Sequence, residues 1–165
     1  MGLRDQNQPG VLEYQRKQEC YSHDTLDEII PLDAGHDSIT AGELLSQARR
    51  LAGPDAELEL GRDVLEKLVC PQCGQEEPMF ASLGQVREDA TWCPDCDRVR
   101  REVVTFYKIR GQEPFRDRTL EQIGVPAYDV VVARAGDRSI GLELAGDAAA
   151  VLGPLVGGED ELEWA

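Results

Sequence analysis

Two Cys-x-x-Cys pairs constrain this chain more than any other feature. The first pair is Cys70 and Cys73, the second is Cys93 and Cys96, and nineteen residues separate the two pairs. Two residues between cysteines let both sulfurs reach one ion, and two such turns facing each other complete a tetrahedron. The spacing is typical of a zinc ribbon. The sequence therefore predicts one structural zinc ion, Zn²⁺, held by these four thiolates.

A redox dithiol and an iron site are the alternatives to zinc. A redox Cys-x-x-Cys usually stands alone near a βαβ pattern, whereas this chain has two pairs and no such pattern. Iron is harder to separate from zinc, because rubredoxin-like and iron–sulfur sites also use four thiolates. With either metal, four protein ligands leave no open coordination position, so the predicted role of the ion is structural and not catalytic.

The composition suggests that folding needs a stabilising contribution from such an ion. Apolar residues make up 41% and aromatic residues 5% of the 165 residues, so we expect a modest core of Leu and Val. A closed zinc site contributes on the order of 10–16 kcal/mol of apparent binding free energy, much of it realised as folding. The metal can therefore offset a thin hydrophobic core.

The charge balance excludes some classes of partner. The chain has 32 acidic and 17 basic residues, a formal net charge of −15. This charge repels phosphate backbones and anionic membrane surfaces, so we expect no affinity for duplex DNA and no membrane binding. No apolar run approaches the ~18 residues that span a bilayer, and the N-terminus lacks the apolar segment of a secretory signal. The expected location is cytoplasmic.

The pattern along the chain predicts three parts. Residues 1–36 are polar, contain Pro and Gly as breakers, and are expected to form an irregular N-terminal extension. Residues 37–153 carry the regular patterns and the two cysteine pairs. Residues 154–165 are expected to form an acidic, flexible tail. The predicted fold class is α+β: a small domain with a four-cysteine zinc ribbon, short helices and a C-terminal β-hairpin.

Two capping boxes predict the helices. Thr40 with Glu43 begins an amphipathic helix that Gly53 ends, and Thr119 with Gln122 begins a short one. Alternating or β-branched runs predict strands at residues 57–60, 103–109, 128–133 and 139–144. The last two strands flank a turn at residues 136–137, whereas the short apolar run at residues 64–69 fits a strand or a helix.

Few other residues suggest chemistry. Cys20, His23 and His36 could form a second metal site or an assisted nucleophile, but a fourth ligand is missing, and a free thiol with two surface imidazoles is the favoured interpretation. No glycine-rich phosphate-binding motif is present. We therefore predict no catalytic residues, no nucleotide cofactor and no ATP-dependent adenylation by the chain alone.

Two clusters of charged residues have simple interpretations. Arg98, Arg100 and Arg101 follow the second cysteine pair and could grip an acidic partner, although a salt-bridged surface is favoured. Carboxylates at residues 55, 57 and 59 are interpreted as a solvated face. Neither cluster by itself predicts a reaction.

A family resemblance extends over about two-thirds of the chain. It rests on Ile39–Leu45, the two cysteine pairs, Gly124–Pro126 and Leu142–Asp147. These segments resemble the C-terminal part of some bacterial ThiF-like proteins, which are adenylyltransferases of the ubiquitin-activating type. Many of them carry a structural zinc held by two Cys-x-x-Cys pairs. Their glycine-rich ATP-binding region has no counterpart here, so the resemblance implies only the four zinc ligands and a fragment, split subunit or accessory protein.

The resemblance and the residues together lead to one expected function and two alternatives. We expect a zinc-binding interaction or accessory module in a ThiF-like, ubiquitin-like or sulfur-carrier activation system. Its expected partner is an adenylating enzyme or a small ubiquitin-like or sulfur-carrier protein. The first alternative is an enzyme component that uses Cys20 as a thiol acceptor. The second is a nucleic-acid-binding zinc ribbon with a local patch at residues 98–101.

Overall fold

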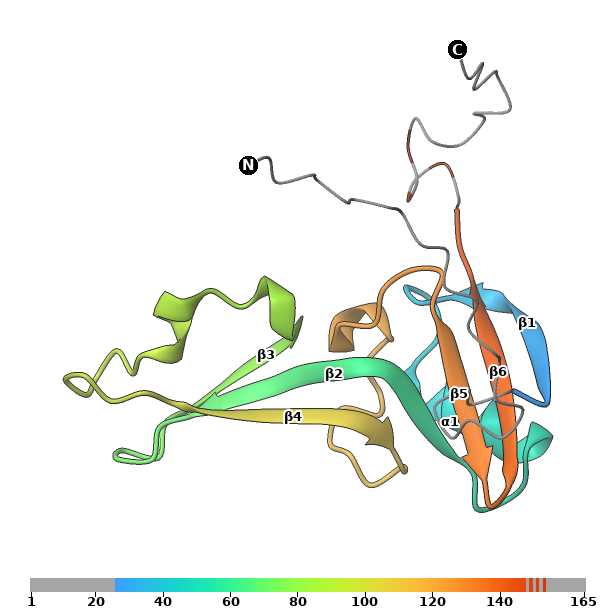
Figure 1. Cartoon of the computed structure of the whole chain (residues 1–165), viewed down its shortest axis with the longest axis horizontal. Helices are drawn as coiled ribbons and strands as arrows, with labels where there is room; N and C mark the ends of the chain where they lie inside the picture. Colours follow the sequence, from blue (N-terminus) through green and yellow to red (C-terminus); the bar gives the residue numbers. More distant parts are fainter. Residues whose placement is uncertain (1–25, 148, 150, 152, 154–165) are drawn as a thin grey trace, which may run out of the picture.

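A single mixed sheet organises the chain (Figure 1). The computed structural model describes residues 26–147, 149, 151 and 153. Within this part the sheet has six strands in the order β1-β6-β5-β2-β3, and β4 pairs with β2. The strands are β1 (Glu28–Gly35), β2 (Glu57–Val69), β3 (Glu76–Ser82), β4 (Glu102–Ile109), β5 (Val130–Ala135) and β6 (Arg138–Ala145). The helix α1 (Ala41–Leu51) and three short 3₁₀ turns, η1 (Leu83–Gln85), η2 (Glu88–Thr91) and η3 (Glu121–Ile123), complete the elements. The predicted α+β class is confirmed.

Strand β2 joins two parts of the molecule that differ in construction. Residues Glu57–Glu59 of β2 pair with β5, and Val64–Val69 pair with β3, while β4 runs along the opposite side of β2. Figure 1 shows β2 leaving the packed layers around α1 and extending away from them between β3 and β4. We call residues 64–109 the arm, and residues 26–63 with 110–147 the lobe.

The core of the lobe forms because α1 is amphipathic and begins at a strong cap. The Thr40 hydroxyl accepts a hydrogen bond from the Glu43 amide at 3.2 Å, and the Glu43 carboxylate accepts one from the Thr40 amide at 2.9 Å. This confirms the first capping box. The apolar face of the helix packs on the sheet and is fully buried at Ala41, Leu44, Leu45 and Ala48.

Most of the expected strands are present. The hairpin β5–β6 turns at Gly136, whose φ of +57° suits glycine, and β4 covers the expected run. The ambiguous residues 64–69 belong to a strand, continuous with the expected strand at residues 57–60. Thr119 and Gln122 also exchange capping hydrogen bonds, at 3.1 and 3.3 Å, but the helix they begin is the three-residue turn η3.

Two strands were not expected. Part of the stretch predicted to be irregular, residues 1–36, forms β1, which pairs in parallel with β6. That prediction was wrong for residues 28–35. Pro31 suggested a break there, and the strand buries no side chain fully: even Ile30 and Leu32 are only half-buried. The second strand, β3, contains Pro78 and lies at the other edge of the sheet, where proline is tolerated.

Some predictions concern residues that the structure does not describe. Cys20, His23, the rest of the N-terminal extension and the acidic tail at residues 154–165 lie outside the described part. In the described part, no helix is long and apolar enough to cross a membrane. The predicted extension and tail therefore stay predictions.

Candidate metal centre

The four cysteines meet at the far end of the arm. Their Sγ atoms all lie within 4.8 Å of one another, with Cys70 to Cys96 at 3.9 Å and Cys73 to Cys93 at 3.8 Å. Four sulfurs at about 2.3 Å from a central ion stand about 3.8 Å apart in a tetrahedron, whereas a disulfide brings two sulfurs to about 2.05 Å. The cluster thus has the dimensions of a four-thiolate site and could bind a metal ion, as the sequence predicted.

The first cysteine pair lies in the connection between β2 and β3. Strand pairing ends at Val69 and Glu76, so residues 70–75 form the hairpin loop. The Cys70 amide donates to the Gln75 carbonyl at 2.9 Å, and the Gly74 amide donates to the Cys70 carbonyl at 2.9 Å. Gly74 has a φ of +74°, a conformation that favours glycine directly after the second cysteine. This compact loop holds both sulfurs on the same side.

The second pair lies in a slightly longer loop before β4. The Cys93 amide donates to the Val99 carbonyl at 2.9 Å, and Trp92 bridges Arg100 across the loop. Arg98 takes the left-handed conformation here, with a φ of +54°. Because Val69 in β2 pairs with both Glu76 and Glu102, the central strand aligns the two loops and brings the cysteine pairs together.

A buried arginine fixes the second loop on the arm. The Arg101 side chain is 6% exposed, pairs with the carboxylate of Glu77 in β3 and donates to the carbonyl of Ala90 in η2. Its amide also donates to the Thr91 carbonyl at 2.7 Å. Arg101 therefore ties β3, η2 and the start of β4 together beside the cysteines. The sequence placed it in a surface cluster, because nothing local shows that an arginine is buried.

The contacts of Arg100 agree with the salt-bridged surface that the sequence favoured. Arg100 forms an ion pair with Glu88 at 3.0 Å, and its guanidinium lies 5.1 Å from the centre of the Trp92 ring. A salt-bridged surface is therefore confirmed for Arg100. With Arg101 paired as well, the cluster offers less free positive charge than its three arginines suggest.

The thiol pKa values show why four sulfurs at this spacing suit a cation. A hydrogen bond from the Cys73 amide, helped by that of Gln72, lowers the pKa of the Cys70 thiol to about 6. Burial, together with the other three thiols, raises the pKa of Cys96 to about 12. One thiolate therefore forms readily, but four negative sulfurs this close repel one another. A cation among them removes that repulsion.

The site lies at the surface of the arm and not in a cleft. Cys70 and Cys93 are buried, with 1% and 6% of their surface exposed, whereas Cys73 is exposed and Cys96 half-buried. An ion can thus reach the sulfurs from solvent without opening the lobe. Near the buried side, Gln75 Oε1 lies 3.8 Å from Cys93 Sγ.

The other candidate residues do not assemble into a site. His36 is half-buried after β1, where its carbonyl accepts from the Glu121 amide at 2.8 Å. In the described residues, the four cysteines form the one cluster of metal-ligating side chains. His36 therefore has no described partner for a second metal site, and Cys20 and His23 stay untested.

Two of the three carboxylates interpreted as a solvated face form ion pairs. Glu57 binds Lys108 and, at 2.7 Å, Arg110, and Glu59 binds Lys108 and, at 2.8 Å, Arg134. The solvated interpretation was wrong for Glu57 and Glu59, because pairing of β2 with β4 and β5 places basic side chains beside them. We call these five residues the ion-pair network.

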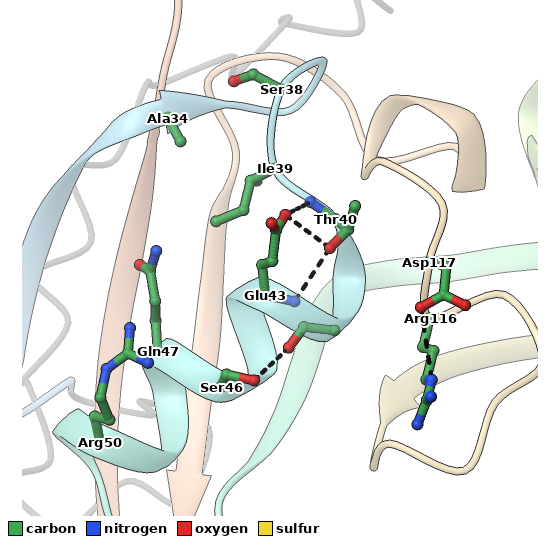
Figure 2. A pocket seen from close by; sticks show the side chains of 11 residues that line it. Ala34, Ser38, Ile39, Thr40, Glu43, Ser46, Gln47, Arg50, Arg116 and Asp117 are labelled. Carbon is green, nitrogen blue, oxygen red and sulfur yellow. Dashed lines mark hydrogen bonds and ion pairs between the residues drawn. The ribbon is translucent and has the colours of Figure 1, made fainter.

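A polar groove of about 730 Å³ runs along α1. Figure 2 shows that its polar groups bond to their own neighbours: Thr40 to Glu43, and Ser46 to the Gly42 carbonyl. Arg50 and Arg116 lie on opposite sides of the view. The groove thus holds no group of converging side chains that a reaction would need.

No family model, no curated protein and no solved structure matches the chain. The resemblance to ThiF-like proteins therefore stays a prediction from the sequence.

Proposed function

We propose that the chain binds one structural zinc ion through Cys70, Cys73, Cys93 and Cys96, and that the arm is a zinc ribbon. The observation that carries the proposal is the four-sulfur cluster, with sulfur–sulfur distances of 3.8 and 3.9 Å across the two pairs. Zinc is well suited to a tetrahedral set of four thiolates, and two facing loops supply that geometry. Iron accepts the same ligands, so the metal must be identified directly.

Elemental analysis of protein purified without added metal tests this part of the proposal. We expect about one equivalent of zinc per chain, because one four-ligand site binds one ion. A protein with iron at the site would be coloured, since ferric thiolate and iron–sulfur centres absorb visible light. Metal-free protein, or a disulfide within either pair under reducing conditions, would contradict the proposal.

We further propose that the chain acts through binding to another protein and not through catalysis. Four thiolates close the coordination sphere of the ion, so no substrate can reach it. In the described part, no other group of His, Cys, Asp and Glu side chains lies close enough together to hold a metal ion. Function is then carried by the surface of the ordered elements.

Trp92 indicates where a partner would bind. It follows η2 directly before Cys93, and 43% of its surface is exposed. Exposed tryptophan is rare on monomer surfaces and enriched among the residues that dominate binding energy. Of the exposed carboxylates near it, Glu88 is paired with Arg100 and Asp89 with Arg87, at 3.0 and 2.9 Å. The formal net charge of the whole chain is −15, so a partner with a basic face and an apolar pocket for Trp92 fits this chemistry.

The identity of the partner rests on the sequence resemblance alone. If the chain is an accessory protein of a ThiF-like system, the partner is an adenylating enzyme or a small ubiquitin-like or sulfur-carrier protein. Cys20 as a thiol acceptor is the alternative within such a system. Loss of cellular function on Cys20→Ala, with fold and partners unchanged, would favour that alternative.

Affinity capture with the metal-loaded chain tests the interaction. We expect a partner that is retained at low salt, released as ionic strength rises, and lost with Trp92→Ala. Ile29→Ala is the matched control, because Ile29 is similarly exposed, at 54%, but lies on β1 in the lobe. Equal loss with both variants, or with neither, would contradict a binding surface at Trp92.

A further inference from the structure

The sheet ends in three edges, and two of them carry a device against further pairing. In the described part, β1, β3 and β4 each pair on one side only. Pro31 lies within β1, whose register with β6 shifts after it, and β3 contains Pro78 together with Phe80, whose φ of +47° distorts the strand. Proline at an edge removes a backbone donor and blocks the addition of another strand.

Strand β4 has no such device. Its sequence, Glu-Val-Val-Thr-Phe-Tyr-Lys-Ile, contains neither proline nor glycine. Among the described residues, its backbone hydrogen bonds go to β2 alone. Two large side chains on this strand are half exposed, Val103 at 48% and Tyr107 at 50%. A regular strand of β-branched and aromatic residues with one unpaired edge is a template for another strand.

The sequence of β4 complements itself when it is read antiparallel about Thr105. In that register Thr105 faces its own copy, Val103 faces Tyr107, and Glu102 faces Lys108. Opposite residues point to the same face of a two-stranded ladder, so the exposed valine and tyrosine meet on one face. Shifting the centre by one residue to either side would place Glu102 opposite Phe106, or Lys108 opposite Val104. The register about Thr105 is the one that pairs opposite charges.

We propose that the free edge of β4 is a self-association surface, where two copies of this chain pair antiparallel about Thr105 and join their sheets across a two-fold axis. An isologous contact of this kind requires one self-complementary patch, which β4 provides. The contact is one strand wide, so the dimer should be weak, with a dissociation constant in the micromolar range or above. The net charge of −15 opposes it, and salt should therefore strengthen it.

This inference does not depend on the proposed partner or on the identity of the metal. Salt separates the two, because partner binding at Trp92 should weaken with ionic strength while pairing of the copies should strengthen. Sedimentation equilibrium of the metal-loaded full chain at several concentrations and salt levels measures the pairing. A monomer under all these conditions would overturn the inference.

A pair of charge variants tests the register. Val103→Glu with Tyr107→Glu places like charges opposite each other twice per dimer, and should weaken association by roughly tenfold or more. Val103→Glu with Tyr107→Lys changes the same positions but places opposite charges together, and should retain dimerisation. Ile29→Glu, on the proline-protected edge, should change nothing. Equal effects of the two double variants would contradict the register.

Cross-linking tests the axis directly. Residues directly opposite in an antiparallel pair have Cα atoms about 4.5–5.5 Å apart, within the range that a disulfide bridges. In a Cys20→Ser background under mild oxidation, Thr105→Cys should therefore yield a covalent dimer. Val103→Cys should not, because the two copies of position 103 lie about 13 Å apart along the strands. Efficient cross-linking by Val103→Cys, or none by Thr105→Cys, would overturn the proposed register.

Discussion

The lobe and the arm share β2, but they are held together by different interactions. In the lobe, α1, β5, β6 and η3 contribute to one continuous apolar cluster that includes Leu44, Leu58, Ile123 and Leu142. Outside that cluster, the arm buries only Leu65, Leu68, Cys70, Cys93 and Arg101 among the described residues. A three-stranded ribbon with so little apolar burial has marginal stability by itself. The lobe therefore depends on hydrophobic burial, whereas the arm depends on the buried Arg101 and, if our proposal is correct, on a metal ion at the four cysteines.

Removing a cysteine ligand should have the largest effect and should separate the stability of the arm from that of the lobe. Cys93→Ser should release the metal and unfold the arm from about residue 68 to 109, because binding free energy on the order of 10–16 kcal/mol is lost with the site. The lobe should stay folded. Hydrogen exchange resolved by residue, together with metal content, measures both outcomes. Unchanged protection in the arm of the metal-free variant would show that the site is peripheral.

A core substitution should produce the opposite pattern. Leu142 in β6 is fully buried, and Leu142→Ala should cost about 2–5 kcal/mol through lost burial and the remaining cavity. Denaturant unfolding should show this loss in the lobe. Metal content at low denaturant should stay at one equivalent, since the cysteines contact the other end of β2. Loss of metal without denaturant would mean that lobe and arm fold as one unit.

Arg101→Ala tests how far the arm depends on the buried arginine that pairs with Glu77. The substitution removes the guanidinium that joins Glu77 and Ala90, and should destabilise the arm by about 2 kcal/mol. Metal affinity should fall because the second loop loses its anchor, and competition with a chelator measures that change. Arg100→Ala is the matched control, since Arg100 is exposed and should cost less than about 1 kcal/mol. Equal effects of the two variants would show that Arg101 stabilises the arm no more than the exposed Arg100 does.

The smallest expected effect is a dependence on acid pH at the junction of lobe and arm. The hydrogen bond from Lys108 lowers the pKa of Glu57. Burial raises the pKa of Glu59, but hydrogen bonds from Lys108 and Arg134 outweigh it and lower the pKa. These carboxylates therefore add stability above the unfolded pKa of about 4.3, and that stability is lost as the pH falls through the folded values.

A Glu57→Gln, Glu59→Gln variant isolates this contribution. Wild type and variant should differ by about 1 kcal/mol or less at pH 7, and the difference should shrink as the pH falls below the unfolded pKa of about 4.3. Thermal unfolding of the metal-loaded proteins across this range checks the change, and metal content measured at each pH identifies any metal release, which also occurs in acid. A difference that grows as the pH falls would contradict the assigned pKa directions.

The sequence by itself determined the features that depend on neighbouring residues. The spacing of Cys70, Cys73, Cys93 and Cys96 identified the cluster, because a two-residue gap brings both sulfurs of a pair to one side of a tight loop. Thr40 and Glu43 identified the start of α1, because a capping box lies within one turn of helix. The β5–β6 hairpin followed from its turn for the same reason.

Only the tertiary structure decided the features that depend on distant residues. β1 pairs in parallel with β6 more than a hundred positions further along, and a parallel partner that remote leaves no local pattern. The same holds for β3 beside β2, for the ion-pair network and for Arg101, whose burial depends on β3 and η2 closing over it. Backbone spacing acts over a few residues, whereas the burial of a charge is decided by whatever packs against it.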